Sequence, residues 1–335
     1  MTHIADTLSA SPLARLHDDA RYLDVLMAFE SRTNGNDDAN PDDHFLAASA
    51  AARLGRIDPA ESWARIALVS YQVRGHVAGV IRATNLLGAL DFERGNLDGA
   101  RGRFATALML ARQLGDTSTI AKATNNLANI AHLRGQTDRA LRLYRAALAA
   151  YRDAHDQRGM AETWHNIGLR YRQQSALRDA IHAAEQAVHH ARQVEQPGLL
   201  VLCLLGLAET EIERQQYAAA ESALDEGGTY AAFAGERLLE LEVARVRAVL
   251  AFRQGAVDRA IGAAMMLRDE ANRRQSALIA AECSMILALG FKATGRVSRA
   301  ANERDAVLDA LKQLGAVDLL ERFELDWDEV VAASR

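Results

Sequence analysis

The sequence predicts an all-α protein, a solenoid of seven stacked helical hairpins with an extra helix at each end. The first observation is a forty-residue period that runs through most of the 335 residues. One position of the period is always alanine: Ala60, Ala100, Ala140, Ala180, Ala220, Ala260 and Ala300. A second position is always small: Ala48, Gly88, Ala128, Gly168, Ala208, Ala248 and Ala288. The second observation is that apolar residues within a period recur at helical spacing, which is typical of amphipathic helices.

The N-terminal region, residues 1–40, is predicted to be one helix followed by a flexible loop. Residues 1–10 are expected to fray. The stretch Ser11 to Glu30 carries leucines on one side of a predicted amphipathic helix. Residues 31–44 are polar and rich in turn-forming residues, which predicts the loop.

Residues 41–315 are predicted to form seven repeats of forty residues, each an antiparallel helical hairpin. The third repeat, 121–156, contains two amphipathic runs separated by the short stretch Arg134 to Asp138. Gly135 is expected to end the first helix with a positive φ, and Asp138 to cap the second by accepting a backbone N–H. The same capping role is predicted at Asp58, Asp98, Asp258 and Ser298.

The repeats resemble the tetratricopeptide family. The fourth repeat carries the resemblance best, through Trp164, Asn166-Ile167-Gly168, Tyr171, Ala180 and Ala187. The resemblance implies a right-handed α-solenoid whose first helices line a concave face that binds proteins or peptides. The forty-residue period is similar to that of kinesin light chain and of bacterial peptide-sensing repeat proteins.

Residues 316–335 are predicted to form a C-terminal capping helix that begins near Asp318. Its apolar stripe includes Phe323 and Trp327. One interpretation is a helix that shields the last repeat, as terminal repeats of solenoids require. The other is a docking or dimerisation handle, which leaves a homodimer open.

Composition and motifs exclude several classes of function. A net charge of −5 without a long basic run argues against nucleic acid as the ligand. No apolar stretch approaches the roughly 20 residues of a membrane span, and the N-terminus lacks signal-peptide character. Cys203 and Cys283 are expected to be buried free thiols, which suits a cytoplasmic location.

We predict no catalytic residue, no cofactor and no metal. The sequence contains no phosphate-binding glycine loop, no HExxH and no CxxC motif. His182, Glu185 and His189 share a predicted helix face, but nothing in the sequence supplies a fourth ligand, so a solvated outer face is the favoured interpretation.

The predicted peptide-binding site lies on the concave face of repeats two to four. Asparagine amides donate and accept, so they can pair with both groups of an extended peptide backbone. An alternative is that the asparagines bridge neighbouring helices. The predicted site residues are Arg82, Asn85, Lys122, Asn125, Asn126, Asn129, His132, His165, Asn166 and Arg172.

A second, apolar groove is predicted at the matching positions of repeats five to seven. It has an acidic edge from Glu209, Glu213, Glu242 and Glu282 and suits an amphipathic helix with basic flanks. The alternatives are that the C-terminal helix or a second copy of the chain fills the groove, or that a shifted register puts these residues in the interior. The residues are Leu205, Ile212, Val249, Phe252 and Leu289.

Together these features predict a non-enzymatic adaptor or scaffold with a protein or peptide partner in the groove. The alternative is a ligand- or peptide-responsive regulator that acts through a separate effector. A third reading is an enzyme with a site in the solenoid groove.

Overall fold

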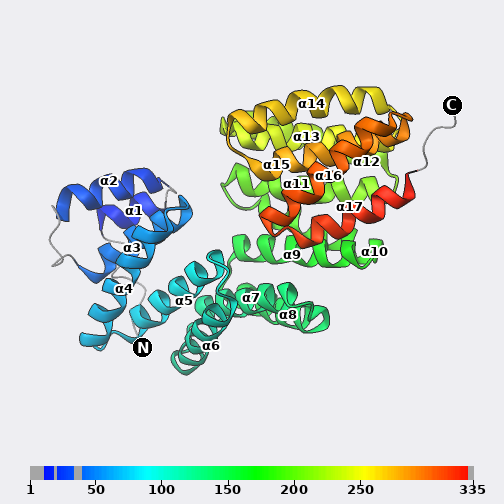
Figure 1. Cartoon of the computed structure of the whole chain (residues 1–335). Coiled ribbons are helices and arrows are strands. Elements are labelled where there is room, and N and C mark those ends of the chain that lie inside the picture. Colours follow the sequence, from blue (N-terminus) through cyan, green and yellow to red (C-terminus); the bar gives the residue numbers. More distant parts are fainter. Residues whose placement is uncertain (1–10, 19–20, 34–39, 331–335) are drawn as a thin grey trace. The chain divides into compact units, whose positions relative to one another are not determined.

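The computed structural model describes residues 11–18, 21–33 and 40–330, and every element in these ranges is a helix (Figure 1). The elements are α1 (Pro12–Asp18), α2 (Tyr22–Thr33), α3 (Pro41–Arg53), α4 (Ile57–Val73), α5 (Val77–Glu93), α6 (Leu97–Leu114), α7 (Thr117–Leu133), α8 (Thr137–Asp153), α9 (Gln157–Gln173), α10 (Leu177–Ala191), α11 (Pro197–Glu213), α12 (Tyr217–Ala234), α13 (Arg237–Arg253), α14 (Val257–Arg273), α15 (Ala277–Ala293), α16 (Val297–Leu314) and α17 (Val317–Glu329). None of the described helices is long and apolar enough to span a bilayer.

The chain divides into two compact units, Met1–Gly159 and Met160–Arg335. The first unit holds α1 and α2 and the hairpins α3–α4, α5–α6 and α7–α8. The second holds the hairpins α9–α10, α11–α12, α13–α14 and α15–α16, followed by α17, and the boundary falls in the first turn of α9. The predicted all-α fold with seven helical hairpins is therefore confirmed.

The periodic small residues lie where helices approach most closely. Of the seven alanines from Ala60 to Ala300, six have no exposed surface and Ala300 is 3 % exposed. At Gly88, an added Cβ would stand 2.8 Å from the ring of Phe104, closer than packed atoms come. A larger residue at these positions overpacks the contact, which explains why the period keeps them small.

The turns inside the hairpins follow the same period. Gly135 ends α7 with a φ of 69°, as predicted. Ser175 and Gln215 hold the equivalent position in later repeats and also adopt positive φ, 57° and 59°. The backbone of this turn is therefore kept where glycine is lost, at a modest strain.

The capping role predicted for the periodic aspartates is wrong. Each second helix begins two residues earlier than expected, so α8 starts at Thr137 and Asp138 lies inside its first turn. From this position the side chain can reach the turn between the two helices of the next hairpin. Asp98 accepts from Arg134 at 2.7 Å, and Asp258 accepts from Arg296 at 2.9 Å. At Asp98 and Asp258 the carboxylate is thus part of an ion pair between successive hairpins.

The single N-terminal helix predicted over Ser11 to Glu30 is two helices, α1 and α2. The Arg21 N–H donates to the Leu16 carbonyl at 2.9 Å, a bond across five residues that turns the chain instead of continuing an α-helix. Of the predicted loop, the first residues extend α2 to Thr33. At its other end, Asn40 caps α3 by accepting from the Asp42 N–H, with Pro41 next to it. Residues 1–10, 19–20, 34–39 and 331–335 lie outside the described residues.

Candidate binding face on the first helices

The predicted binding residues lie on the first helices of hairpins. We name the side formed by these helices, taken in each unit by itself, the first-helix face. In the first unit, α5 carries Arg82 and Asn85, and α7 carries the remaining predicted residues of that unit. On α7, Lys122 is exposed, Asn125 is buried, and the other three are half-buried: Asn126, Asn129 and His132. Sequence spacing therefore placed the set on the intended helices.

Several of these polar side chains make contacts inside the first unit. Arg82 lies 3.5 Å from the carboxylate of Asp42 and stacks over the ring of Phe45 at 5.4 Å. The Tyr71 hydroxyl donates to the same carboxylate at 2.5 Å. Burial and this carboxylate raise the pKa of Tyr71, so the phenol stays protonated.

The asparagines have different surroundings. Asn129 accepts a hydrogen bond of 2.6 Å from the Tyr144 hydroxyl on α8, so it joins the two helices of its hairpin. The Oδ1 atom of Asn85 is buried and has no hydrogen-bond partner among the described residues. A buried acceptor without a partner is unfavourable in the free protein, and a ligand that donates to it would relieve this.

In the second unit, the three predicted residues His165, Asn166 and Arg172 lie on α9. Arg172 pairs with Glu209 at 2.8 Å and with Glu213 at 3.4 Å, both on α11. His165 packs against Gly206, where an added Cβ would stand 2.9 Å from its Nδ1. Burial, with the positive charge of Arg172, lowers the pKa of His165 to about 4, so the imidazole is neutral at pH 7.

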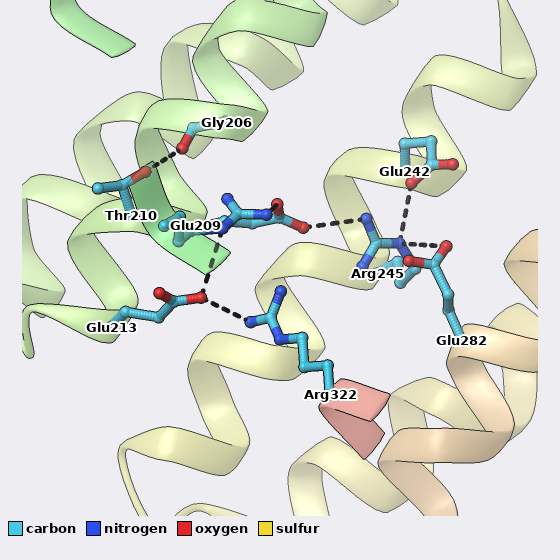
Figure 2. A network of polar contacts seen from close by, with 9 residues as sticks. Gly206, Glu209, Thr210, Glu213, Glu242, Arg245, Glu282 and Arg322 are labelled. Carbon is cyan, nitrogen blue, oxygen red and sulfur yellow. Dashed lines mark hydrogen bonds and ion pairs between the residues drawn. The ribbon is translucent and has the colours of Figure 1, made fainter. Parts of the chain in front are cut away.

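Arg245 on α13 is the centre of the polar network on this face (Figure 2). Its guanidinium, 10 % exposed, contacts Glu209 at 3.3 Å, Glu242 at 2.8 Å and Glu282 at 3.3 Å. These contacts come from α11, α13 and α15, so one side chain joins three successive first helices. The predicted acidic edge is therefore present, but its carboxylates are neutralised by arginines of the same unit.

The carboxylates around Arg245 differ in their acidity. Burial alone would raise the pKa of Glu209, but the charges of Arg172 and Arg245 dominate and hold it at about 2. Burial raises the pKa of Glu282 to about 7, because Arg245 opposes the shift only in part and Glu242 and Glu209 add to it. Glu209 is thus ionised at neutral pH, whereas the pKa of Glu282 lies near neutral pH.

Helix α17 lies across the first helices of the second unit and contacts each of them. Asp318 accepts from Gln173 on α9 at 2.9 Å and lies 3.8 Å from Arg170 of the same helix. Further along α17, Arg322 donates to Glu213 on α11 at 2.9 Å. Asp326 then accepts from Arg253 on α13 at 2.5 Å. Last, the ring of Trp327 lies against Lys292 on α15, with the ammonium 4.6 Å from the ring centre.

The apolar side of α17 packs against the predicted apolar groove only in part. Phe323 is fully buried in one cluster with Leu289, while Phe252 and Trp327 pack against that cluster. Leu205 and Ile212 are instead core residues between α10 and α13, and Val249 lies at the edge of that core. The groove residues thus fall into two sets, one interior and one under α17.

Sequence reasoning missed the basic residues Arg245, Arg253 and Arg322. A signal for Arg245 was present, because it lies two periods after His165 and three after Asn125, at a position already assigned to the groove. No periodic signal marks Arg322, which belongs to α17 outside the repeats.

No group of residues suited to a metal ion occurs in the described part of the chain. His182 packs edge-on against Trp164 with ring centres 5.8 Å apart, and His189 is hydrogen-bonded to Gln193 at 2.9 Å.

A cleft of about 440 Å³ opens away from these residues in the second unit, between α12, α13 and α14. Its floor includes Ala244 and Ala251. Leu204 stands one period before Ala244, and Phe291 stands one period after Ala251. The cleft therefore forms where this repeat has alanine in place of a larger side chain. None of the predicted site residues lines it.

Comparison with known proteins places the fold. Residues 119–193 match the tetratricopeptide repeat family. No curated protein matches the sequence.

Solved structures resemble the chain over most of its length. The apo form of the quorum sensor NprR from B. thuringiensis has a TM-score of 0.66 at 14% identity, over 92% of this chain and 89% of that one. The apo form of RapI has a TM-score of 0.66 at 14% identity, over 82% and 98%. The Rap conjugation gene regulator of the plasmid pLS20, in complex with the Phr* peptide, has a TM-score of 0.64 at 13% identity, over 83% and 75%. At these identities the likeness concerns the fold.

Proposed function

We propose that this chain, a tetratricopeptide repeat protein, acts as an adaptor or scaffold that binds a protein or peptide segment on its first-helix face. The observation that carries the proposal is α17. The first helices of the second unit already hold a segment of the chain, through at least one contact to each of α9, α11, α13 and α15. A face that accommodates one such segment has the shape and the polar groups to recognise others.

The first unit supports the proposal with a different chemistry. Lys122 is exposed on α7, and the amide of Asn126 lies one turn further on the same side. The unpartnered Oδ1 of Asn85 adds a buried acceptor on α5. This combination suits a polar or acidic extended segment whose backbone N–H groups donate to amide oxygens. The pLS20 regulator, a protein of similar fold, is itself in complex with a peptide.

The carboxylates of the second unit suit binding better than catalysis. A general base needs a pKa near the working pH and access to a substrate proton. Glu209 is held at a pKa of about 2 by two arginines. Glu282 has a pKa of about 7, but its side chain is largely buried and lies 3.3 Å from Arg245, which also contacts Glu209 and Glu242. We therefore assign no catalytic residue and no cofactor to this face.

The partner we propose is a protein or peptide in the cytoplasm, neither a nucleic acid nor a membrane. The net charge of −5 opposes phosphate backbones. Cys203 and Cys283 are both free and buried, as expected in a reducing compartment.

A selection from a displayed library of random peptides tests the proposal with the full chain. We expect enrichment of polar or acidic sequences, and calorimetry with a selected peptide should show weaker binding by Lys122→Glu and Asn126→Ala. The matched control is Arg142→Glu on α8, exposed and outside the first-helix face. Absence of enrichment, or equal binding by all three variants, contradicts the proposal.

A second candidate is a peptide-responsive regulator that acts through a separate effector. The position of α17 favours it, because a ligand that competes for the same helices would move this helix and so change the surface of the protein. A selected peptide that leaves the fluorescence of Trp327 and the exchange of α17 amides unchanged would argue against this candidate.

A further inference from the structure

We propose that α17 occupies, in a displaceable manner, a docking site for an external amphipathic helix with the same order of side chains. This order is an acidic residue, then Arg-Phe one turn later, then an acidic residue followed by Trp after one more turn. The inference rests on the proposed function, since it takes the first-helix face as a binding face and names the class of partner for its second unit.

The contacting residues of α17 are evenly spaced. Asp318, Arg322 and Asp326 follow one another at steps of four residues, and Phe323 and Trp327 do so as well. Four residues are about one helical turn, so both series run along one side of the helix. The other side carries Glu321, Glu324 and Leu325, and Leu325 is 68 % exposed.

The surface beneath α17 carries the opposite order of charge. Arg170 of α9 faces Asp318, Glu213 of α11 faces Arg322, and Arg253 of α13 faces Asp326. At the end of the series, Lys292 of α15 stacks on Trp327 and donates to its backbone carbonyl. Alternating charges of this kind give an interface its register and its direction.

The site also has an apolar anchor point. Phe323 is buried completely in a cluster that includes Met285, Leu289 and Val307. It is the only buried residue of α17. A buried aromatic anchor with polar contacts around it is the arrangement in which interface hot spots are found.

The attachment of α17 is suited to exchange. Its ion pairs are partly exposed; the side chain of Arg322 is 36 % and that of Asp318 52 % exposed. Such pairs stabilise weakly. The helix is held in place largely because the turn at Gly315 connects it to α16, which gives it a high effective concentration. An external helix with the same pattern can therefore compete when it makes the same contacts.

The test is binding in trans of a fluorescently labelled peptide with the sequence of residues 316–330, measured by anisotropy with the full chain. In the wild-type protein the resident helix competes, and we expect weak binding. The variant Arg322→Glu/Asp326→Arg weakens only the resident helix, and it should bind the wild-type peptide about tenfold or more tightly than the wild-type protein does.

Two comparisons make the result specific. The control variant Glu321→Arg/Glu324→Arg reverses two exposed charges on the other side of α17 and should bind the peptide like the wild type. Adding Glu213→Gln to the released variant removes the carboxylate that faces Arg322 of the peptide and should weaken binding, whereas a peptide with Gln in place of Arg322 should bind equally with and without this change. Circular dichroism checks that each variant keeps its helicity. The variant Asp326→Asn weakens the attachment of α17 less, so a smaller increase in peptide affinity is expected for it.

A folded, released variant that binds the peptide no better than the wild type overturns the inference. Equal gains for the released and the control variant also overturn it. If the inference fails while a library-selected peptide still binds through Lys122 and Asn126, the proposed function stands, and α17 is a structural cap only.

Discussion

Arg322 on α17 donates a hydrogen bond of 2.9 Å to Glu213 on α11, across 109 residues of sequence. Burial raises the pKa of Glu213, and Arg322 and Arg172 oppose that shift, so the carboxylate depends on its arginine partners to stay ionised. The contact is the point at which the C-terminal helix meets the polar network of the first-helix face.

A double-mutant cycle on this pair should give a small, favourable coupling. Arg322→Gln and Glu213→Gln each remove one partner, and the double variant should be more stable than additivity predicts by about 0.5–1 kcal/mol, the range of partly exposed ion pairs. Urea unfolding followed by Trp fluorescence measures it. A coupling of zero would show that the hydrogen bond does not hold α17.

Substitution of Ala140 by Leu should destabilise the first unit. Ala140 has no exposed surface, so three added carbons must displace neighbouring helices, at about 1–3 kcal/mol. Ala146→Leu is the matched control, since this alanine is exposed on the same helix. Equal melting temperatures of the two variants would contradict the close helix contact.

The contribution of Glu282 to the stability of the second unit should fall as the pH rises from about 4.5 to 7, whereas that of His165, whose pKa is lowered to about 4, should rise between about pH 4 and 6.5. Glu282 has its pKa raised from 4.5 to about 7, so its carboxyl group holds a proton more tightly in the folded state than in the unfolded state. The stability gained in this way is complete below pH 4.5 and is lost as the pH rises through 7. The groups facing it are Arg245 and Glu242 on α13, Glu209 on α11 and Arg322 on α17.

Glu282→Gln should remove the Glu282 contribution, so that the stability of the variant relative to the wild type rises between pH 5 and pH 8. Glu209 acts in the opposite sense: with a pKa lowered to about 2, its stabilisation is lost only below pH 4.5. Thermal melting at the two pH values provides the measurement. Parallel profiles of variant and wild type would show that Glu282 is ionised throughout.

Asn129→Ala should destabilise the protein, whereas Lys122→Ala should not. The first change removes the amide oxygen that accepts from the Tyr144 hydroxyl, and loss of this hydrogen bond costs about 1 kcal/mol. Lys122 is exposed, so its removal affects stability little. If both variants keep the wild-type free energy of unfolding, the hydrogen bond between Tyr144 and Asn129 does not stabilise the protein.

The two cysteines should resist thiol reagents in the folded protein. Burial raises the pKa of Cys203 to about 12 and that of Cys283 to about 11, so almost no thiolate exists at neutral pH. We expect slow labelling in buffer and fast labelling of both in denaturant. Rapid modification of either thiol in the native protein would contradict its burial.

Much of the fold was predictable because one period fixes many contacts at once. Ala140 and its six counterparts, and Gly135 with its equivalents, report local packing and local turns, which a repeated sequence encodes directly. The break between α1 and α2 was missed because it lies outside the repeats, where no second copy indicates the boundary.

The candidate site was predictable only in part. Spacing placed Lys122, Asn126 and Arg172 on first helices, because a helical face follows from sequence separation. It did not separate Leu205, which is interior, from Leu289, which lies under α17, since a first helix packs apolar residues against neighbours on more than one side. The position of α17 depends on contacts between residues far apart in sequence, and no periodicity encodes them.

Hydrogen exchange of the full chain, with and without a library-selected peptide, tests the central claim most directly. Binding on the first-helix face predicts slower exchange in first helices such as α7 and α9, with second helices such as α8 and α14 unchanged. Protection confined to second helices, or to the cleft between α12, α13 and α14, would contradict the account, and so would a bound peptide that protects no first helix.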